Sequence, residues 1–230
     1  PQPFFRPLAD LADELSFPLT DTEETSEPDV PFSQLSEGLY LIGGRPGMGK
    51  TTALMRLAAK LAAGGTPVYL WSAEELRQRS ADCLFAQPGV DGTALIRVAD
   101  GPVKLEALLN AAQCEITDGV LLLDGIRWLI EPGSLYPMPN PYSDIWLREA
   151  QVAATLKTFA KQCHLPIVAT VPLLRETELR ADHRPTLADV RYQRLRAEAD
   201  AVTLLYRDDY YNDGGDPAMQ YIAAKDVRRA

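Results

Sequence analysis

Short apolar runs alternate along the chain with segments in which apolar residues recur every three or four positions. The short runs are typical of buried strands, and the longer spacing is typical of helices with one buried face. This alternation predicts an α/β fold in which a twisted, mainly parallel sheet carries helices on both faces. A turn at 212–215 before the last run predicts a closing C-terminal β-hairpin. The predicted strands are 39–42, 68–71, 95–98, 120–123, 166–171, 201–206 and 219–224.

The first 37 residues lack this alternation. Leu8, Leu11, Ala12 and Leu15 form one short apolar helical stripe, and 21–29 is an acidic, Pro-containing stretch that reads as a linker. We therefore divide the chain into an N-terminal arm with an acidic linker, 1–37, and one α/β domain, 38–230. So small a stripe cannot bury itself alone. Two alternatives stay open: it folds back on its own domain, or it docks on a neighbouring subunit.

The composition fits one large domain of a cytoplasmic protein. At 230 residues and 46% apolar content, the chain can build a stable core without covalent links. Cys83, Cys114 and Cys163 are widely spaced without metal-type pairing, and we expect reduced, buried thiols. Cys163 belongs to the expected inner face of a long helix capped by Ser143. No apolar run is long enough to span a bilayer and no signal peptide opens the chain, so no membrane association is expected.

The net charge of −9 argues mildly against nucleic-acid binding, because phosphate contacts usually need a basic face. An acidic protein can still bind DNA where its basic residues converge. Any such interpretation therefore has to rest on local clusters of arginine and lysine.

The segment Gly44–Thr51 reads GRPGMGKT and fits the spacing G-x-x-x-x-G-K-[ST] of a Walker A phosphate loop. A predicted strand precedes it and a predicted helix follows, as the motif requires. Backbone amides around the glycines and the helix N-terminus favour an anion. We expect ATP with Mg²⁺, Lys50 reaching the β- and γ-phosphates, and the Thr51 hydroxyl holding the metal. The alternative is a Gly-rich turn that binds nothing. The predicted nucleotide-binding residues here are Gly44, Arg45, Pro46, Gly47, Met48, Gly49, Lys50, Thr51 and Thr52.

Two carboxylates accompany the loop. Asp124 ends the apolar run 120–123, which is the Walker B arrangement, and is expected to hold the magnesium shell through water. The alternative is a solvated aspartate at a strand end.

Glu74 follows the strand 68–71, which we expect beside the phosphate strand. Ser72 and Glu75 have the S-x-x-E spacing of a capping box, so Glu75 has a structural explanation and Glu74 has none. We assign Glu74 as the catalytic base that handles water; the alternative is a charge at the start of a helix.

Four segments carry a further pattern: Gly44–Thr52, Arg180–Arg191, Leu204–Tyr211 and Ala224–Lys225. In matching order and separation, they resemble the C-terminal ATPase domain of bacterial replicative helicases of the DnaB type. The resemblance runs from about residue 31 to the end, implies a RecA-like fold, and covers this ATPase domain only, not the N-terminal helical domain of the family. The apolar stripe at 8–15 is similar to the family's helix that docks on an adjacent subunit.

The resemblance implies a six-membered ring with ATP at each subunit interface and single-stranded DNA in the central channel. It matches Glu74 to the family's catalytic glutamate and Asp124 to its Walker B aspartate. It also implies that Arg207 lies near the nucleotide base and that Lys225 approaches the γ-phosphate of the next subunit.

Two positions depart from the family. Its sensor glutamine is replaced by Pro172, which cannot donate or relay, and its arginine finger by Val227. Arg228 or Arg229 can replace the finger only with a shift in register. The loss matters because a finger is worth roughly 10³ to 10⁵ in turnover in other phosphate-loop enzymes.

Arg191, Arg194 and Arg196 lie together without an intervening acid and are the predicted DNA-binding residues. Tyr192 is expected to stack a base. The alternative is a solvated turn whose arginines pair with Glu198 and Asp200.

These observations predict a magnesium-dependent ATPase that acts in DNA replication or recombination as an oligomeric single-stranded DNA translocase. The first alternative is a degenerate regulatory or assembly ATPase that binds ATP and a replication-protein partner without unwinding DNA. Pro172 and Val227 favour that alternative, whereas Lys50, Glu74 and Asp124 favour a motor. A small-molecule kinase is a weaker third reading.

Overall fold

An eight-stranded sheet forms the centre of the protein in the computed structural model, which describes residues 3–14, 30, 32, 35–73, 77–87, 90, 95–130 and 141–227. The strand order is β1-β4-β3-β5-β6-β2-β7-β8. Neighbouring strands from β4 to β7 pair in parallel, and only the two edge strands are antiparallel. This confirms the mainly parallel sheet and the closing hairpin. The strands are β1 Arg6–Pro7, β2 Gly38–Gly44, β3 Val68–Ser72, β4 Ile96–Asp100, β5 Val120–Asp124, β6 Pro166–Pro172, β7 Ala201–Tyr206 and β8 Gln220–Asp226.

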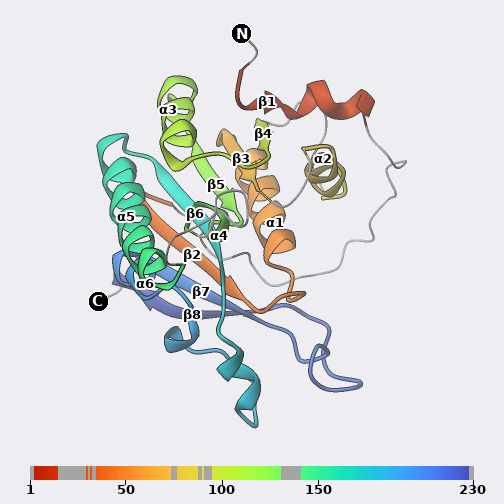
Figure 1. Ribbon diagram of the computed structural model, residues 1–230. Helices are drawn as coiled ribbons and strands as arrows, with labels where there is room; N and C mark the ends of the chain where they lie inside the picture. The colour runs from red at the N-terminus through yellow and green to blue at the C-terminus, as the bar shows by residue number, and fades with distance from the viewer. Residues whose placement is uncertain are drawn as a thin grey trace.

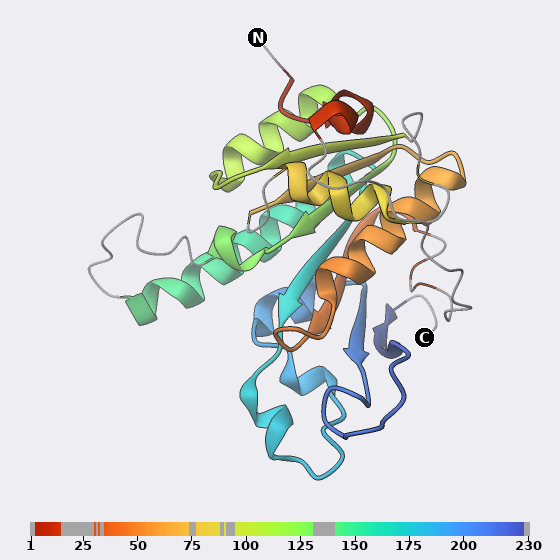
Figure 2. The ribbon, with the colours of Figure 1, turned by 90° about the vertical axis from the view of Figure 1, so that its right-hand side faces the viewer.

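Helices cover both faces of the sheet (Figures 1 and 2). One face carries α1 Lys50–Ala63, α2 Arg77–Phe85 and the 3-10 helix η1 Leu8–Glu14. The other carries α3 Leu105–Glu115, α4 Arg127–Ile130, α5 Pro141–Gln162 and α6 Gln193–Glu198. Two further 3-10 helices, η3 Arg175–Leu179 and η4 Leu187–Asp189, follow β6. Among the described helices, none combines the length and apolarity that a membrane span requires.

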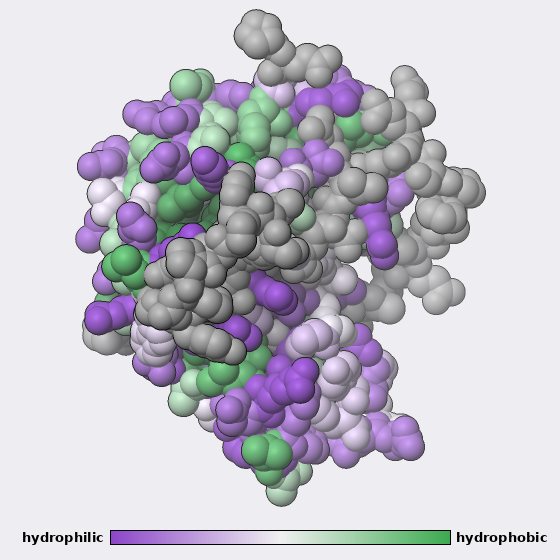
Figure 3. Space-filling view, viewed as in Figure 1, coloured by the Kyte–Doolittle hydropathy of each residue, from purple (hydrophilic) through white to green (hydrophobic). Residues whose placement is uncertain are grey.

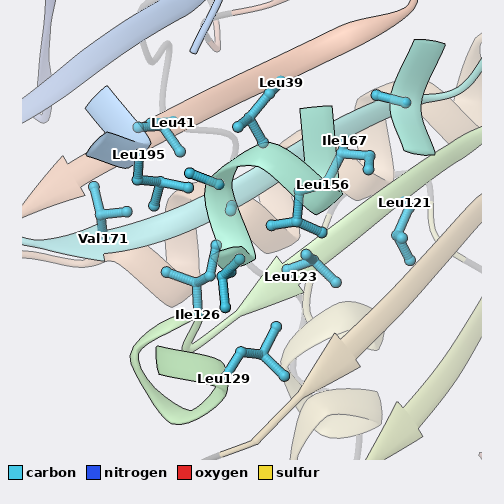
Figure 4. Close-up of a cluster of buried hydrophobic side chains, with 14 of the residues drawn as sticks. Leu39, Leu41, Leu121, Leu123, Ile126, Leu129, Leu156, Ile167, Val171 and Leu195 are labelled. Atoms are coloured by element: carbon cyan, nitrogen blue, oxygen red, sulfur yellow. The ribbon is translucent and has the colours of Figure 1, made fainter. Parts of the chain in front are cut away.

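The two faces explain why the central strands read as unbroken apolar runs. Leu39 and Leu41 of β2 point to the face of α5 and α6, while Tyr40 and Ile42 point to the face of α1. Because successive side chains alternate, a strand covered on both sides needs apolar residues at every position. Figure 4 shows the face covered by α5 and α6, where side chains of the strands contact those of the overlying helices, such as Leu156 of α5.

The N-terminal arm folds back on its own sheet, which decides between the two alternatives left by the sequence. In β1, Arg6 pairs antiparallel with Val98 of β4. The Phe4 and Phe5 amides donate to Glu115 Oε1 and Oε2 at 2.7 and 2.9 Å, and the Phe5 ring is fully buried. Leu8 and Leu11 are buried with α1 and α2, and the acidic linker lies outside the described residues. The boundary at 37/38 stays a prediction.

Three local predictions were wrong. The strand β3 does not lie beside the phosphate strand β2 as predicted, because β5 and β6 lie between them. After α1 the chain skips two positions in the sheet, and β5 and β6 occupy these positions later in the sequence. The three cysteines are exposed, because they lie on the solvent side of α2 and α3 and just beyond α5. The long helix begins at Pro141, so Ser143 lies within its first turn. Proline suits that first position because its missing N–H would have no partner there.

Segments 173–191 and 207–219 extend beyond the carboxyl ends of the strands and form a projection at the bottom of Figure 1. Figure 3 shows that this projection is mainly hydrophilic, with a small hydrophobic patch at its lower end. Leu179 of η3 is the most exposed large apolar side chain among the described residues, at 85%. The phosphate loop lies where this projection joins the sheet.

Candidate functional site

The phosphate loop, residues 45–49, connects β2 to α1 with the backbone that an anion site needs. Gly47 and Gly49 have φ values of 75° and 87°, which glycine adopts without strain. A Cβ on Gly49 would lie 2.8 Å from Met219 Cε, the end of a flexible side chain that can shift, so the positive φ is what favours glycine here. Gly49 is the N-cap of α1 and provides no side-chain cap, which leaves the first amides of this 14-residue helix for a ligand. The loop therefore fits a phosphate group.

Lys50 lies across the loop. Its Nζ donates to the Arg45 carbonyl at 3.2 Å. A Cβ on Gly44 would lie 3.0 Å from Lys50 Cγ, so glycine at the end of β2 makes room for the lysine stem. The lysine is thus held at the mouth of the loop, where a bound phosphate would compete for its protons.

Asp124 is buried at the end of β5 and is held by two threonines. Thr51 Oγ1 donates to its Oδ2 at 2.9 Å, and Thr170 Oγ1 of β6 donates to its Oδ1, also at 2.9 Å. The Gly125 amide donates to Thr170 Oγ1 at 2.9 Å, which fixes that hydroxyl. The structure thus brings the predicted Walker A and Walker B residues into direct contact. Thr170 was missed by the sequence prediction; its only signal is a polar residue inside an apolar strand.

The donor set fits magnesium. Thr51 and Asp124 offer a hydroxyl and a carboxylate, and Mg²⁺ prefers such oxygen ligands together with water and phosphate. Among the described residues, no group of three or more His, Cys, Asp and Glu side chains could hold a metal ion. A magnesium ion would therefore be held by these two residues with nucleotide and water completing its shell.

Glu74 and Arg228 lie outside the described residues, so their assigned roles stay predictions. The residue before Glu74 is informative: the Ala73 amide donates to the Asp124 carbonyl at 3.2 Å. β3 and β5 pair with Ser72 beside Asp124. The described part of β3 and Ala73 therefore end next to Asp124, although β3 is not the neighbour of β2.

Arg45 has its guanidinium buried beneath the loop. Nε and Nη2 donate to Glu178 Oε1 of η3 at 2.9 and 2.7 Å, and Nη1 donates to the Leu173 carbonyl at 2.9 Å. The side chain of Arg45 is therefore hydrogen-bonded to the segment that follows β6. The separation of 133 residues between Arg45 and Glu178 leaves no local signal for this pair in the sequence.

Segment 207–219 lies against the phosphate loop. The Tyr210 hydroxyl donates to the Pro46 carbonyl at 3.1 Å. Arg207 forms a two-pronged pair with Asp209, at 2.9 and 2.6 Å, and this hydrogen bonding raises the pKa of Arg207 and lowers that of Asp209. Arg207 thus belongs to a segment that contacts the loop, and its place near a nucleotide base stays a prediction.

Residues 191–196, which carry the three predicted DNA-binding arginines, are called the arginine segment below. Most of this segment belongs to the short helix α6 and is not an irregular loop. Glu149 of α5 is buried and accepts hydrogen bonds from the Arg194 and Leu195 amides at the start of α6. Arg191 and Arg194 are exposed, whereas Arg196 Nη1 donates to the Leu187 carbonyl at 3.0 Å. Two arginines of the three are therefore presented to solvent.

Tyr192 cannot stack a base as predicted. Its side chain is 1% exposed and belongs to the core beneath α6. The alternative predicted that the arginines pair with Glu198 and Asp200; the Asp200 carboxylate instead pairs with Lys157 and accepts the Leu39 amide at 2.8 Å.

Lys225 of β8 contacts its own chain. Its Nζ donates to the Arg196 and Ala197 carbonyls at 3.1 and 2.8 Å, near the C-terminal end of α6. Burial lowers the pKa of Lys225 below its ordinary value. Its approach to a neighbouring subunit stays a prediction. Val227, in the finger position, is 54% exposed.

Comparison with known proteins supports the family resemblance. Residues 147–228 match the family model described as the DnaB-like helicase C terminal domain. The chain is 32% identical over 124 residues to the replicative DNA helicase DnaB of Geobacillus stearothermophilus, covering 54% of this chain and 25% of the relative. It is 26% identical over 211 residues to the DnaB of Buchnera aphidicola subsp. Acyrthosiphon pisum, covering 77% and 44%. The chain thus spans less than half the length of these curated relatives.

Solved structures share the fold. One of them, described as an ATPase domain, superposes with a TM-score of 0.68 at 21% identity, covering 83% of this chain and 78% of that one. A structure described as a DnaB-like replicative helicase and its interactions with primase has the same TM-score at 22% identity, covering 83% and 52%. These findings confirm the resemblance to the DnaB-type C-terminal domain and the RecA-like fold, and they support the prediction of a P-loop ATPase.

Proposed function

We propose that this relative of the DnaB-type motor domain is a magnesium-dependent ATPase that acts as an oligomeric single-stranded DNA translocase in replication or recombination. One observation carries the ATPase: Thr51 and Asp124 meet at 2.9 Å beside the loop that presents Lys50. Lys50 would bind the β- and γ-phosphates, and Thr51 and Asp124 would hold magnesium. Glu74, one residue beyond Ala73, would orient or deprotonate water.

The DNA-binding part of the proposal rests on Arg191 and Arg194, which are exposed on the side of the strands' carboxyl ends. Six copies in a ring would bring these arginines together into a positive collar despite the acidic total charge. In such a ring Lys225 and Arg228 would serve the nucleotide of the adjacent subunit. The names of the relatives as replicative DNA helicases support a cytoplasmic protein with a partner in the replication machinery.

The decisive experiment measures ATP turnover with and without single-stranded DNA, together with the mass of the oligomer in ATP. We expect DNA to raise turnover severalfold, Lys50→Ala to abolish nucleotide binding, and Glu74→Gln to lower turnover by roughly 100-fold or more. Replacing both Arg191 and Arg194 by alanine should remove the stimulation. Arg97→Ala, an exposed arginine on β4, is the matched control.

An unchanged rate with DNA, from a protein that stays monomeric in ATP, would exclude the motor. It would leave a regulatory ATPase, which Pro172 and Val227 in place of the sensor and finger already favour. Turnover unaffected by Lys50→Ala would refute the ATPase itself.

A further inference from the structure

A short antiparallel ladder joins the end of β6 to the arginine segment. The Arg191 amide donates to the Pro172 carbonyl at 3.2 Å, Leu173 bridges Val190, and the Leu174 amide donates to the Asp189 carbonyl at 2.8 Å. Any displacement of Leu173 is therefore passed directly to the backbone that carries Arg191.

The far side of this ladder is rigid. The carboxylate of Asp189 is buried, pairs with Arg180, and accepts hydrogen bonds from the Thr186 amide and hydroxyl at 2.6 and 2.9 Å. The first residues of α6 are held by Glu149. A body held this firmly moves as a unit and does not absorb a displacement locally.

Arg45 connects the phosphate loop to this ladder. Its guanidinium grips the Leu173 carbonyl and Glu178 at the same time, with three hydrogen bonds between 2.7 and 2.9 Å. Its own carbonyl accepts the Lys50 ammonium. One residue thus touches both the lysine that a phosphate would attract and the strand end that leads to Arg191.

We propose that Arg45 and Glu178 are positioning residues through which nucleotide at the phosphate loop changes the DNA affinity of the arginine segment. Phosphate binding draws Lys50 from the Arg45 carbonyl, and the peptide at 45 then moves with its guanidinium, taking Leu173 and Glu178 along. Pro172 has no N–H or side-chain donor to form such a connection. The inference rests on the proposed function, since it takes ATP as one ligand and single-stranded DNA as the other.

The first test compares the dissociation constant of a fluorescent single-stranded oligonucleotide with and without a non-hydrolysable ATP analogue and magnesium. Coupling between two sites is typically about 5- to 150-fold in affinity, and we expect the wild-type protein to fall in that range. Glu178→Ala should reduce the ratio to near one, while Glu176→Ala, an exposed carboxylate on the same 3-10 helix, should keep it. Arg45→Ala should reduce the affinity ratio by the same factor. The variant that combines Arg45→Ala with Glu178→Ala should reduce it no further, because both substitutions remove the same connection.

The second test does not need DNA. Hydrogen exchange of the Leu174 and Arg191 amides should change when the ATP analogue binds to the wild-type protein, and should stay unchanged in Glu178→Ala. Glu178→Gln, which keeps an oxygen to accept Arg45 and loses the charge, serves if the alanine variant does not fold. In that variant the affinity ratio should fall at least twofold.

The outcomes separate the two proposals. A folded Glu178 variant with the wild-type affinity ratio and exchange pattern overturns the inference and leaves the proposed function standing. A wild-type protein that binds the analogue but no DNA overturns the proposed translocase. The connection from the loop to 173–191 then survives only if the exchange change occurs and Glu178→Ala abolishes it.

Discussion

Phe5→Ala tests whether the N-terminal arm belongs to the fold of its own domain. The Phe5 ring is fully buried between α3 and the sheet, and it meets Phe4 and Tyr69 edge to face at centroid distances of 5.0 and 5.5 Å. Its amide is one of the two bound by Glu115. The ring therefore fills a closed space with aromatic neighbours on two sides.

The expected cost follows from that burial. Removing a fully buried phenylalanine side chain typically costs about 3 to 5 kcal/mol, because the transfer free energy is lost and a cavity is left. The arm lies at the edge of the sheet and can partly collapse into the cavity, so we expect the lower value, about 3 kcal/mol. Leu179→Ala, at the 85% exposed position, should change the free energy of unfolding by less than about 0.5 kcal/mol.

Urea unfolding followed by circular dichroism measures both variants, at two protein concentrations that differ by about a hundredfold. The difference between the wild-type and Phe5→Ala midpoints should not depend on concentration, because the arm contacts its own chain. Equal effects of Phe5→Ala and Leu179→Ala would refute the docking of the arm. A difference between the two midpoints that changes on dilution would show instead that the arm is bound by a neighbouring subunit.

Two other predictions concern single polar contacts. Thr170→Val should lower ATP turnover roughly tenfold, since a hydrogen bond to a charged group is worth about 1.5 to 3 kcal/mol and Asp124 would lose one; Thr203→Val, a buried threonine of β7, is the control and should leave turnover unchanged. Asp189→Asn should destabilise the protein at pH 7 by about 1 to 2 kcal/mol, measured by urea unfolding. Burial acts to raise the pKa of Asp189, but hydrogen bonds from Arg180 and Thr186 outweigh it and lower the pKa below the ordinary 3.8. The stabilisation is therefore complete above about pH 4 and lost as the pH falls through the lowered value, so the gap between wild type and variant should narrow there; a constant gap would contradict the assignment.

Local patterns predicted the parts of this fold whose chemistry is contained in a few consecutive residues. The run 120–123 forms a strand that ends in Asp124, as expected, because a parallel strand covered on both faces leaves a clear apolar signature. The motif GRPGMGKT likewise predicted a glycine-dependent loop between a strand and a helix. Thr51 could be placed beside Asp124 because both motifs end at the same edge of the sheet.

Contacts between distant residues were not predictable in this way. Arg6 and Pro7 have no strand signal, and they form a strand only because β4 offers an unpaired edge. Tyr192 stands among arginines, and nothing nearby in the sequence indicates that α6 turns it into the core. Glu149 and Glu178 act on partners 45 and 133 residues away, so their roles depend on topology that a single sequence does not reveal.

The edge positions of β1 and β8 allow the width of the sheet to be measured between two strands of the same chain. An eight-stranded sheet has seven gaps, and at about 4.8 Å each the two outer strands are about 34 Å apart. Fluorophores attached within β1 and within β8 would therefore lie at a separation that resonance energy transfer measures well. The phosphate loop leaves the sheet from β2, an inner strand, so such a pair could report on the width of the sheet without touching the nucleotide.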